Sequence, residues 1–109
     1  MARFVTVTRV GESPPGAGKT VAVEGRQIGV FNCSGEHLAV DALCTHAEAL
    51  LHEGSLDCGV GTVECWLHGA EFDLRSGDVV RGPATEPVAT YPVRVVDGEV
   101  QVGLPDAEG

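Results

Sequence analysis

The sequence predicts a small all-β protein built from short antiparallel strands. Amphipathic runs of helical period are scarce, whereas 15 glycines and 6 prolines interrupt the chain of 109 residues at short intervals. Valine dominates the apolar residues, and its β-branched side chain suits the half-buried surface of a sheet. At this length we expect one domain, residues 1–109, with a modest core and no second, catalytic domain.

The first half of the chain is expected to form one strand and then a meander. Phe4–Val10 alternates loosely between apolar and polar residues, and a loop rich in Gly and Pro follows at Gly11–Gly18. Turns are expected at Glu24–Arg26 and Cys33–Glu36. The expected strands of the meander are Thr20–Val23, Gln27–Phe31 and His37–Val40.

The second half is expected to contain shorter strands. Ala47–Leu51 suits one helical turn or an irregular loop, and Cys58–Gly61 suits a Gly-rich turn. Asp97-Gly98 is the clearest hairpin signal in the chain, because both residues tolerate the positive φ of a tight turn. We expect a stiff loop at Gly82–Pro87 and a polar tail at Leu104–Gly109. The expected strands are Gly54–Asp57, Thr62–Glu64, Ala70–Asp73, Val79–Val80, Tyr91–Val96 and Glu99–Val102.

Gly18-Lys19-Thr20 matches the end of a phosphate-binding loop motif, but the surrounding residues do not fit. The motif needs a glycine five positions before Gly18, where this chain has Ser13. It also needs a helix afterwards, whereas Val21–Gly25 has the pattern of a strand and a turn. We therefore expect no nucleotide-binding site there.

The chain is acidic, with a formal net charge of −9 and a pI near 4.6. Nucleic acids and anionic membranes attract basic surfaces, so we expect neither as a partner. A basic protein partner fits this charge, and so does an acidic surface that only keeps the protein soluble. The N-terminus lacks an apolar run of signal-peptide length, and no segment approaches membrane-spanning length, which predicts a cytoplasmic protein.

Two short pairs of cysteine and histidine carry the strongest chemical signal. The first pair is Cys44-Thr45-His46, and the second is Cys65-Trp66-Leu67-His68, which Gly69 follows. Each pair offers a thiolate and an imidazole, and both groups bind iron. The 18 residues between the pairs, Ala47–Glu64, are enough for the chain to return and bring the pairs side by side. Together the four side chains would complete one metal site.

Other interpretations of these residues stay open. Cysteine is often a small buried apolar residue and histidine an ordinary polar one, in which case no metal binds. A structural zinc site also uses two of each, but its cysteine pair normally precedes its histidine pair, and here the order alternates. His52 and Cys58 are rival ligands between the pairs. Cys33 and Cys58 have no obvious partner, and in a reducing compartment we expect both to be free thiols.

The two pairs, in this order and with this gap, resemble the Rieske signature, Cys-x-His followed by Cys-x-x-His-Gly. In that signature two cysteines hold one iron of a [2Fe-2S] cluster and two histidines hold the other. The resemblance covers Val21–Val102 and implies an antiparallel β-sandwich with a small cluster-binding subdomain, at about residues 43–86. Gly82–Pro87 resembles the proline-containing segment that covers the cluster. The implied ligands of one [2Fe-2S] cluster are Cys44, His46, Cys65 and His68.

Departures from the high-potential Rieske proteins of respiratory complexes predict a low reduction potential. Those proteins carry a further cysteine in each ligand loop, joined as a disulfide, at positions that match Ala49 and Leu67 here. They also place a serine and a tyrosine, whose hydroxyls donate hydrogen bonds to cluster sulfur, at positions that match Ala70 and Phe72. Such donors raise the potential, so their loss predicts the low end of the Rieske range of about −150 to +300 mV.

Low potential, small size and the lack of a membrane anchor resemble the ferredoxins of aromatic-ring-hydroxylating dioxygenases. An oxygenase would need a mononuclear iron site in a separate large domain. The resemblance implies a soluble, monomeric one-electron carrier between a flavin-dependent reductase and a terminal oxygenase, without turnover of its own. Glu64–Gly69 and Phe72–Gly77 also resemble housekeeping Rieske proteins associated with iron–sulfur cluster assembly. A non-redox metal-binding module is a third class.

The resemblance also implies where partners dock. In a Rieske geometry the two histidines present their outer ring nitrogens at the protein tip, so the histidine-bound iron is expected nearest the partner. Leu50, Trp66 and Leu67 are expected to form an apolar collar around this tip. Glu48, Glu53 and Glu71 are expected to form an acidic rim that steers a basic partner, unless they are scattered solvated charges.

Overall fold

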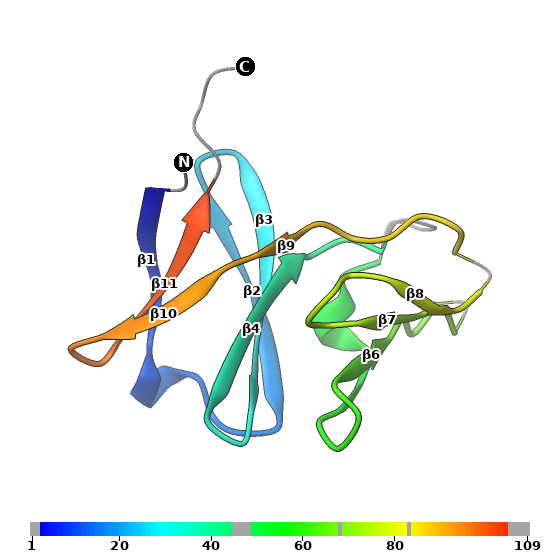
Figure 1. Ribbon diagram of the computed structural model, residues 1–109, viewed down its shortest axis with the longest axis horizontal. Coiled ribbons are helices and arrows are strands. Elements are labelled where there is room, and N and C mark those ends of the chain that lie inside the picture. The colour runs from blue at the N-terminus through cyan, green and yellow to red at the C-terminus, as the bar shows by residue number, and fades with distance from the viewer. Residues whose placement is uncertain (1–2, 45–48, 68, 83, 105–109) are drawn as a thin grey trace.

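Short antiparallel strands make up almost all of the regular structure in the computed structural model, which describes residues 3–44, 49–67, 69–82 and 84–104 (Figure 1). This part of the chain contains no α-helix, and so no helix that could span a bilayer. The all-β prediction is confirmed. The elements are β1 Arg3–Arg9, η1 Val10–Glu12, β2 Ala17–Val23, β3 Arg26–Cys33, β4 Glu36–Asp41, η2 Leu51–Glu53, β5 Ser55–Asp57, β6 Thr62–Glu64, β7 Glu71–Asp73, β8 Val79–Arg81, β9 Thr90–Tyr91, β10 Val93–Val96 and β11 Glu99–Leu104.

Two sheets pack face to face and form the predicted sandwich. Their strand orders are β1-β11-β10 and β2-β3-β4-β9. In β11 the core residues Val100, Val102 and Leu104 stand at alternate positions, because successive side chains in a strand point to opposite faces. The core between the sheets consists of Val23, Ile28, Val30, Ala39, Tyr91, Val100, Val102 and Leu104.

Three two-residue turns set the register of the sandwich. Asp97-Gly98 connects β10 to β11 with φ values of 51° and 78°, which confirms the predicted hairpin. Glu24-Gly25 and Ser34-Gly35 adopt the same left-handed conformations between β2 and β3 and between β3 and β4. Two consecutive positive φ values match the twist of the flanking strands, which explains why each turn ends in glycine.

The chain crosses between the two sheets at Pro92. Tyr91–Val96 was predicted as one strand, and the structure shows two. Tyr91 in β9 pairs with Ala39 in β4, whereas Val93 in β10 pairs with Val102 in β11. Proline has no backbone N–H to continue a ladder, and the Pro92 carbonyl instead accepts a hydrogen bond from the N–H of Gly103 (2.8 Å).

Gly18 lies inside strand β2 rather than in the predicted loop Gly11–Gly18, and Lys19 and Thr20 follow it in the same strand. The strand begins at Ala17 and pairs antiparallel with β3 along its whole length. Gly18 lies against the ring of Phe31, where an added Cβ would approach a ring carbon to 2.3 Å. This glycine is therefore required for strand packing.

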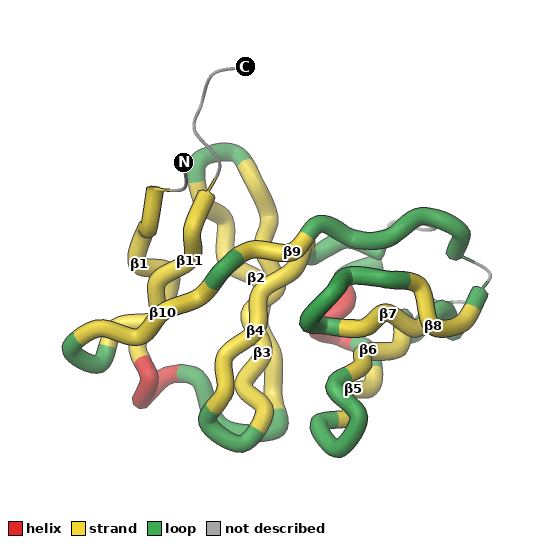
Figure 2. Tube along the Cα trace, in the orientation of Figure 1, coloured by secondary structure: helices red, strands yellow, loops and turns green. Residues whose placement is uncertain are grey.

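A third sheet, of order β5-β6-β7-β8, stands beside the sandwich and carries the second half of the metal motif (Figures 1 and 2). A second core joins it to the outer face of the sandwich. Phe31 and Val40 come from the sandwich, while Val63 and Phe72 come from the third sheet and Leu51 from the 3-10 turn η2. Cys44, Cys65, Ala49, Ala70, Leu74, Ala84 and Val88 complete this core.

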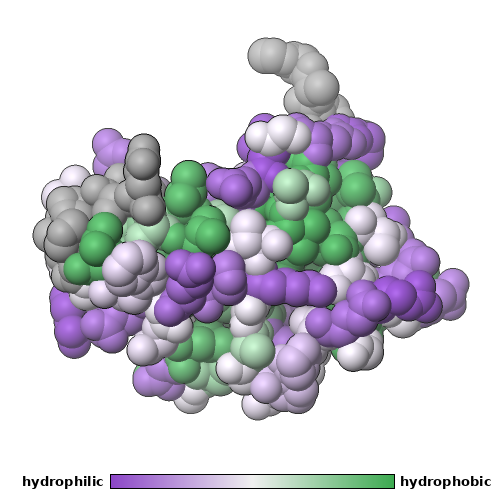
Figure 3. Space-filling model, turned by 180° about the vertical axis from the view of Figure 1, so that it is seen from behind, coloured by the Kyte–Doolittle hydropathy of each residue, from purple (hydrophilic) through white to green (hydrophobic). Residues whose placement is uncertain are grey.

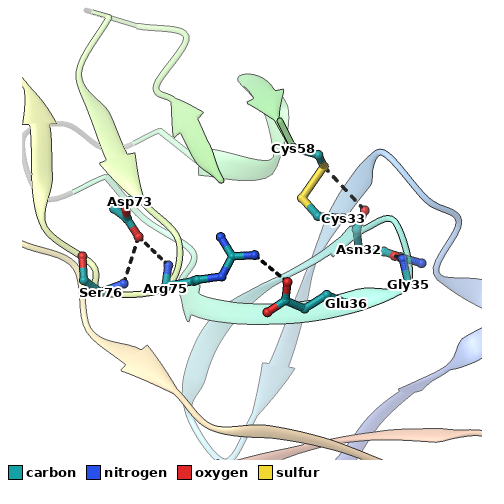
Figure 4. Close-up of polar contacts among 8 residues, drawn as sticks. All are labelled: Asn32, Cys33, Gly35, Glu36, Cys58, Asp73, Arg75 and Ser76. Atoms are coloured by element: carbon teal, nitrogen blue, oxygen red, sulfur yellow. Dashed lines mark hydrogen bonds and ion pairs between the residues drawn. A yellow bond between two sulfur atoms is a disulfide. The ribbon is translucent and has the colours of Figure 1, made fainter. Parts of the chain in front are cut away.

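The carboxylate of Asp73 organises the turn between β7 and β8 (Figure 4). Its Oδ1 accepts hydrogen bonds from the backbone N–H groups of Arg75 (2.8 Å) and Ser76 (3.1 Å). These bonds, with that from Ser76 contributing most, lower the pKa of Asp73. A lowered folded-state pKa means that the carboxylate stabilises the fold above its unfolded pKa and loses this effect as the pH falls through the folded value.

We expect Asp73→Ala to lower the free energy of unfolding at pH 7 by about 1 kcal/mol, the usual value of such bonds. The difference from the wild type should shrink as the pH falls below about 4, the ordinary pKa of aspartate. Urea unfolding at pH 7 and pH 3 measures both values. Asp78→Ala, in the same turn and exposed, is the matched control. An Asp73→Ala deficit that is equal at both pH values would contradict this role.

Candidate metal centre

Two loops of equal size carry the predicted ligands. In the first, the N–H of Cys44 donates to the carbonyl oxygen of Ala49 (3.0 Å). In the second, the N–H of Cys65 donates to the carbonyl oxygen of Ala70 (2.7 Å). Each cysteine therefore starts a loop that closes five residues later. The sequence spacings, Cys-x-His and Cys-x-x-His, do not show this common construction.

Strand pairing holds the base of each loop. An isolated antiparallel bridge joins Leu43 to Leu50 on either side of the first loop. The second loop connects β6 to β7, and the pair Glu64 and Glu71 stands at its base. Each cysteine thus directly follows paired backbone, at equivalent points of the two loops. This pairing limits how far either sulfur can move.

Both cysteines are buried in the same core and neither is in a disulfide. Cys44 is 5% exposed and Cys65 is 1% exposed. His46 and His68, the predicted histidine ligands, lie outside the described residues. Within the described ranges no three His, Cys, Asp or Glu side chains gather as a metal-binding group. The structure therefore places the sulfur half of the predicted ligand set.

Two glycines allow the second loop to form. Gly69 has φ of +81°, a left-handed conformation, and its N–H donates to the carbonyl oxygen of Cys65 (3.0 Å). Gly54, between η2 and β5, lies so close to β6 that an added Cβ would be 1.8 Å from the carbonyl oxygen of Glu64. The requirement at Gly54 is not visible in the sequence, because it arises from contact between segments that are ten residues apart.

The prediction that Cys33 and Cys58 are free thiols is wrong. The two residues form a disulfide between the end of β3 and the turn after β5, with their Cα atoms 5.2 Å apart. Their separation of 25 residues gave no sign of this, because the packing of the third sheet on the sandwich brings them together. The four cysteines therefore divide into a disulfide pair and the pair Cys44 and Cys65.

Both rival ligands have other partners. Cys58 is bound to Cys33, so its sulfur is not a thiolate. His52, in η2, lies with its Nδ1 2.8 Å from Oγ1 of Thr20, a hydrogen bond between the 3-10 turn and strand β2. Neither side chain is thus disposed as a ligand in this structure.

The two positions at which the sequence predicts a missing hydroxyl donor, Ala70 and Phe72, lie at the end of the second loop and in β7. Ala70 and Phe72 are both 0% exposed and belong to the same core as Cys44 and Cys65. Ala49 is 2% exposed and belongs to this core too, whereas Leu67 is 41% exposed, and neither residue is a cysteine. The core around the two thiols is therefore apolar at Ala49, Ala70 and Phe72.

The family model described as the Rieske [2Fe-2S] domain matches residues 3–92. This chain belongs to the Rieske [2Fe-2S] family. A Rieske domain holds one [2Fe-2S] cluster, and the donor atoms present here fit it. Cys44 and Cys65 supply two buried sulfurs, the ligand type that suits iron–sulfur clusters, from two equivalent loops in one core.

This Rieske protein is similar to ferredoxins of dioxygenase systems. It is 43% identical over 81 residues to the 3-phenylpropionate/cinnamic acid dioxygenase ferredoxin subunit of Shigella flexneri serotype 5b, covering 74% of this chain and 76% of that protein. The ferredoxin of carbazole 1,9a-dioxygenase from Nocardioides aromaticivorans IC177 superposes with a TM-score of 0.87 at 32% identity, over 91% of this chain and 95% of that one.

A third relative was solved together with its partner. A complex of reduced oxygenase and oxidized ferredoxin in carbazole 1,9a-dioxygenase contains a chain that matches with a TM-score of 0.84 and 31% identity, over 91% of both chains. The predicted resemblance to dioxygenase ferredoxins is confirmed by these three proteins.

Proposed function

We propose that this Rieske protein is a soluble ferredoxin that carries single electrons from a flavin-dependent reductase to a terminal oxygenase and has no turnover of its own. The observation that carries this proposal is the similarity to a dioxygenase ferredoxin over 95% of that protein's length. Residues 1–109 act as one domain, in which about residues 43–86 form the cluster-binding subdomain.

Cys44, His46, Cys65 and His68 hold the cluster in this proposal. When bound, the [2Fe-2S] cluster accepts and releases one electron. Cys44 and Cys65 shield the inner side from water, since both are at least 95% buried. His46 and His68 bind on the outer side, so that their imidazole edges form the exit toward a partner.

The potential of this ferredoxin lies at the low end of the Rieske range. Two thiolates and two neutral imidazoles leave the oxidised cluster uncharged, whereas four thiolates would leave it negative. An uncharged cluster accepts an electron more readily, so its reduction potential lies above that of plant-type ferredoxins, which is about −400 mV. Ala70 and Phe72 donate no hydrogen bond to sulfur, which removes a stabilisation of the reduced form. A low potential suits a carrier that receives electrons from a flavin and passes them on to an oxygenase.

An apolar collar beside the ligand loops forms the docking face. Trp66 is 54% exposed and Leu67 is 41% exposed, in the second ligand loop itself, and Leu50 is partly buried at the base of the first. Hydrophobic residues lie among hydrophilic ones on the visible surface at the end of the molecule that carries the third sheet (Figure 3). Exposed aromatic and aliphatic side chains of this kind form the centre of many interfaces.

The acidic rim of this face rests on two described carboxylates. Glu53 is exposed at the end of η2. Glu71 pairs with Arg81 at 3.4 Å, so part of its charge is already compensated. Glu48, the third predicted member, lies outside the described residues. The net charge of −9 favours a basic partner surface and disfavours binding to nucleic acid or anionic membranes. In this proposal the carrier is a monomer in the cytoplasm.

We expect electron transfer to the partner to slow as ionic strength rises, because salt screens charges over about 8 to 10 Å at physiological concentration. Glu53→Lys should reduce the association rate several-fold at low salt and leave the visible spectrum unchanged. Glu12→Lys, an exposed carboxylate in η1 of the sandwich, is the matched control and should have little effect. Stopped-flow rates across a salt series measure both. A rate that changes neither with salt nor with Glu53→Lys would place the docking face elsewhere.

The proposed function is tested directly by single-turnover transfer. The ferredoxin, reduced chemically and freed of reductant, is mixed with the oxidised oxygenase of the 3-phenylpropionate/cinnamic acid dioxygenase, whose ferredoxin subunit is 43% identical. We expect the visible absorption of the oxygenase to fall as it is reduced, while the ferredoxin is reoxidised by the same number of electrons. A ferredoxin that stays reduced with this oxygenase, while the native ferredoxin subunit reacts, would favour the alternative housekeeping role in cluster assembly.

A further inference from the structure

The disulfide joins the sandwich to the third sheet, at a boundary that is called the seam below (Figure 4). Cys33 ends strand β3 of the sandwich, and Cys58 begins the turn between β5 and β6 of the third sheet. The covalent ring that they close contains the first ligand loop with Cys44. Opening this bond therefore affects how the cluster-binding sheet is held on the sandwich.

The other polar contacts across the seam are weaker. Arg75 and Glu36 form an ion pair whose side chains are 53% and 51% exposed, so that solvent screens it. Thr20 and His52 share one hydrogen bond. The apolar core that contains Phe31, Val40 and Phe72 spans the seam and does not depend on the disulfide. Reduction is thus expected to loosen the third sheet without unfolding it.

The two sulfurs differ in access. Cys33 is 6% exposed, whereas Cys58 is partly exposed in a turn whose next residues, Gly59 and Val60, are exposed, Val60 at 67%. A thiol–disulfide exchange needs the attacking thiolate to approach one sulfur, and the accessible sulfur here is that of Cys58. An entering thiolate would therefore bond to Cys58 and expel the thiolate of Cys33.

We propose that Cys33 and Cys58 form a site of reversible oxidation, which a dithiol reductant opens and the corresponding oxidised dithiol closes. In the forward direction one thiolate of the reductant attacks Sγ of Cys58, forming a mixed disulfide and releasing Cys33 as a thiolate. The second thiol of the reductant then displaces Cys58 and leaves as a cyclic or intramolecular disulfide. Two electrons pass from the reductant to the cysteine pair, and the reverse sequence restores the bond.

This site lies outside the proposed electron-transfer route, since neither cysteine belongs to the predicted cluster ligands. Its effect reaches the cluster through the fold. With the bond open, the ring around the first ligand loop is no longer closed, and the third sheet opens more often. We expect the protein to lose its cluster faster when the Cys33–Cys58 disulfide is reduced, with little change in the spectrum of freshly prepared protein.

The test compares the holoprotein with and without dithiothreitol, followed by iodoacetamide and mass spectrometry. Alkylation of Cys33 and Cys58 is expected only after dithiothreitol, and oxidised dithiothreitol should reverse it. The midpoint melting temperature should fall by about 10 °C or more on opening, as the loss of a loop constraint of this length implies. Hydrogen exchange should rise in the turns at 34–35 and 58–61 and stay constant along β1 and β11.

The double variant Cys33→Ser, Cys58→Ser is the control for the reductant itself. Its melting temperature and cluster half-life should match those of the opened wild type and should not respond to dithiothreitol. Free thiols at both positions in protein kept with oxidised dithiothreitol would overturn the proposal, because no disulfide would then form. A disulfide that resists excess dithiothreitol in the folded protein would also overturn it, because the bond would then be purely structural.

Discussion

Replacing Cys65 with alanine is expected to abolish the visible absorption of the purified protein, and Cys44→Ala, His46→Ala and His68→Ala should each do the same. Each change removes one of the four proposed ligands, and Cys65 is 1% exposed, so that water has little access to take the place of its sulfur. The wild type is expected to be red-brown, with two irons and two acid-labile sulfides per chain. Absorption spectra together with iron and sulfide analysis measure the result.

The matched controls use the two rival ligands. His52→Ala removes the hydrogen bond to Thr20, and Cys58→Ser removes the disulfide to Cys33, yet freshly prepared protein with either change should retain its cluster. Loss of iron in one of these variants would show that a ligand is misassigned. Zinc in place of iron in the wild type, without visible absorption, would contradict the cluster itself and favour a non-redox module.

The second large effect concerns the reduction potential. Ala70→Ser and Phe72→Tyr should each raise it, on the order of tens of millivolts, if the new hydroxyl donates a hydrogen bond to sulfur and so stabilises the reduced cluster. Both positions are fully buried in the core that contains Cys44 and Cys65, which places them near the sulfur half of the site. Spectroelectrochemical titration of the bound cluster measures the shift.

Val63→Thr controls for polarity alone. Val63 is 0% exposed in the same core, but it lies in β6 outside the ligand loop, so its hydroxyl should leave the potential nearly unchanged and only reduce stability. A wild-type potential well above zero would contradict the low-potential assignment. Equal shifts from Val63→Thr and Ala70→Ser would show that general polarity, rather than a bond to sulfur, sets the potential.

Much of this protein is readable from local sequence. Valine-rich segments with glycine turns predicted most of the strands, and Asp97-Gly98 predicted its hairpin because the turn conformation depends on those two residues alone. The cysteine and histidine spacings resemble the Rieske signature, and this resemblance predicted the family. Pro92 divides the predicted strand Tyr91–Val96 into two. A proline within a strand pattern is a local sign of such a break, but the prediction followed the apolar pattern of its neighbours.

Other features depend on residues that meet only in the folded chain. Cys33 and Cys58 pair because the turn after β5 packs against the end of β3, and nothing in their spacing distinguishes partners from free thiols. Gly54 is required because the carbonyl of Glu64 lies where a side chain would be. The sequence by itself determined the all-β class and the resemblance to the Rieske family, since these follow from local conformation and from the spacing of four donor residues. Only the tertiary structure decided which cysteines pair and how the two ligand loops close, because those outcomes depend on packing between distant segments.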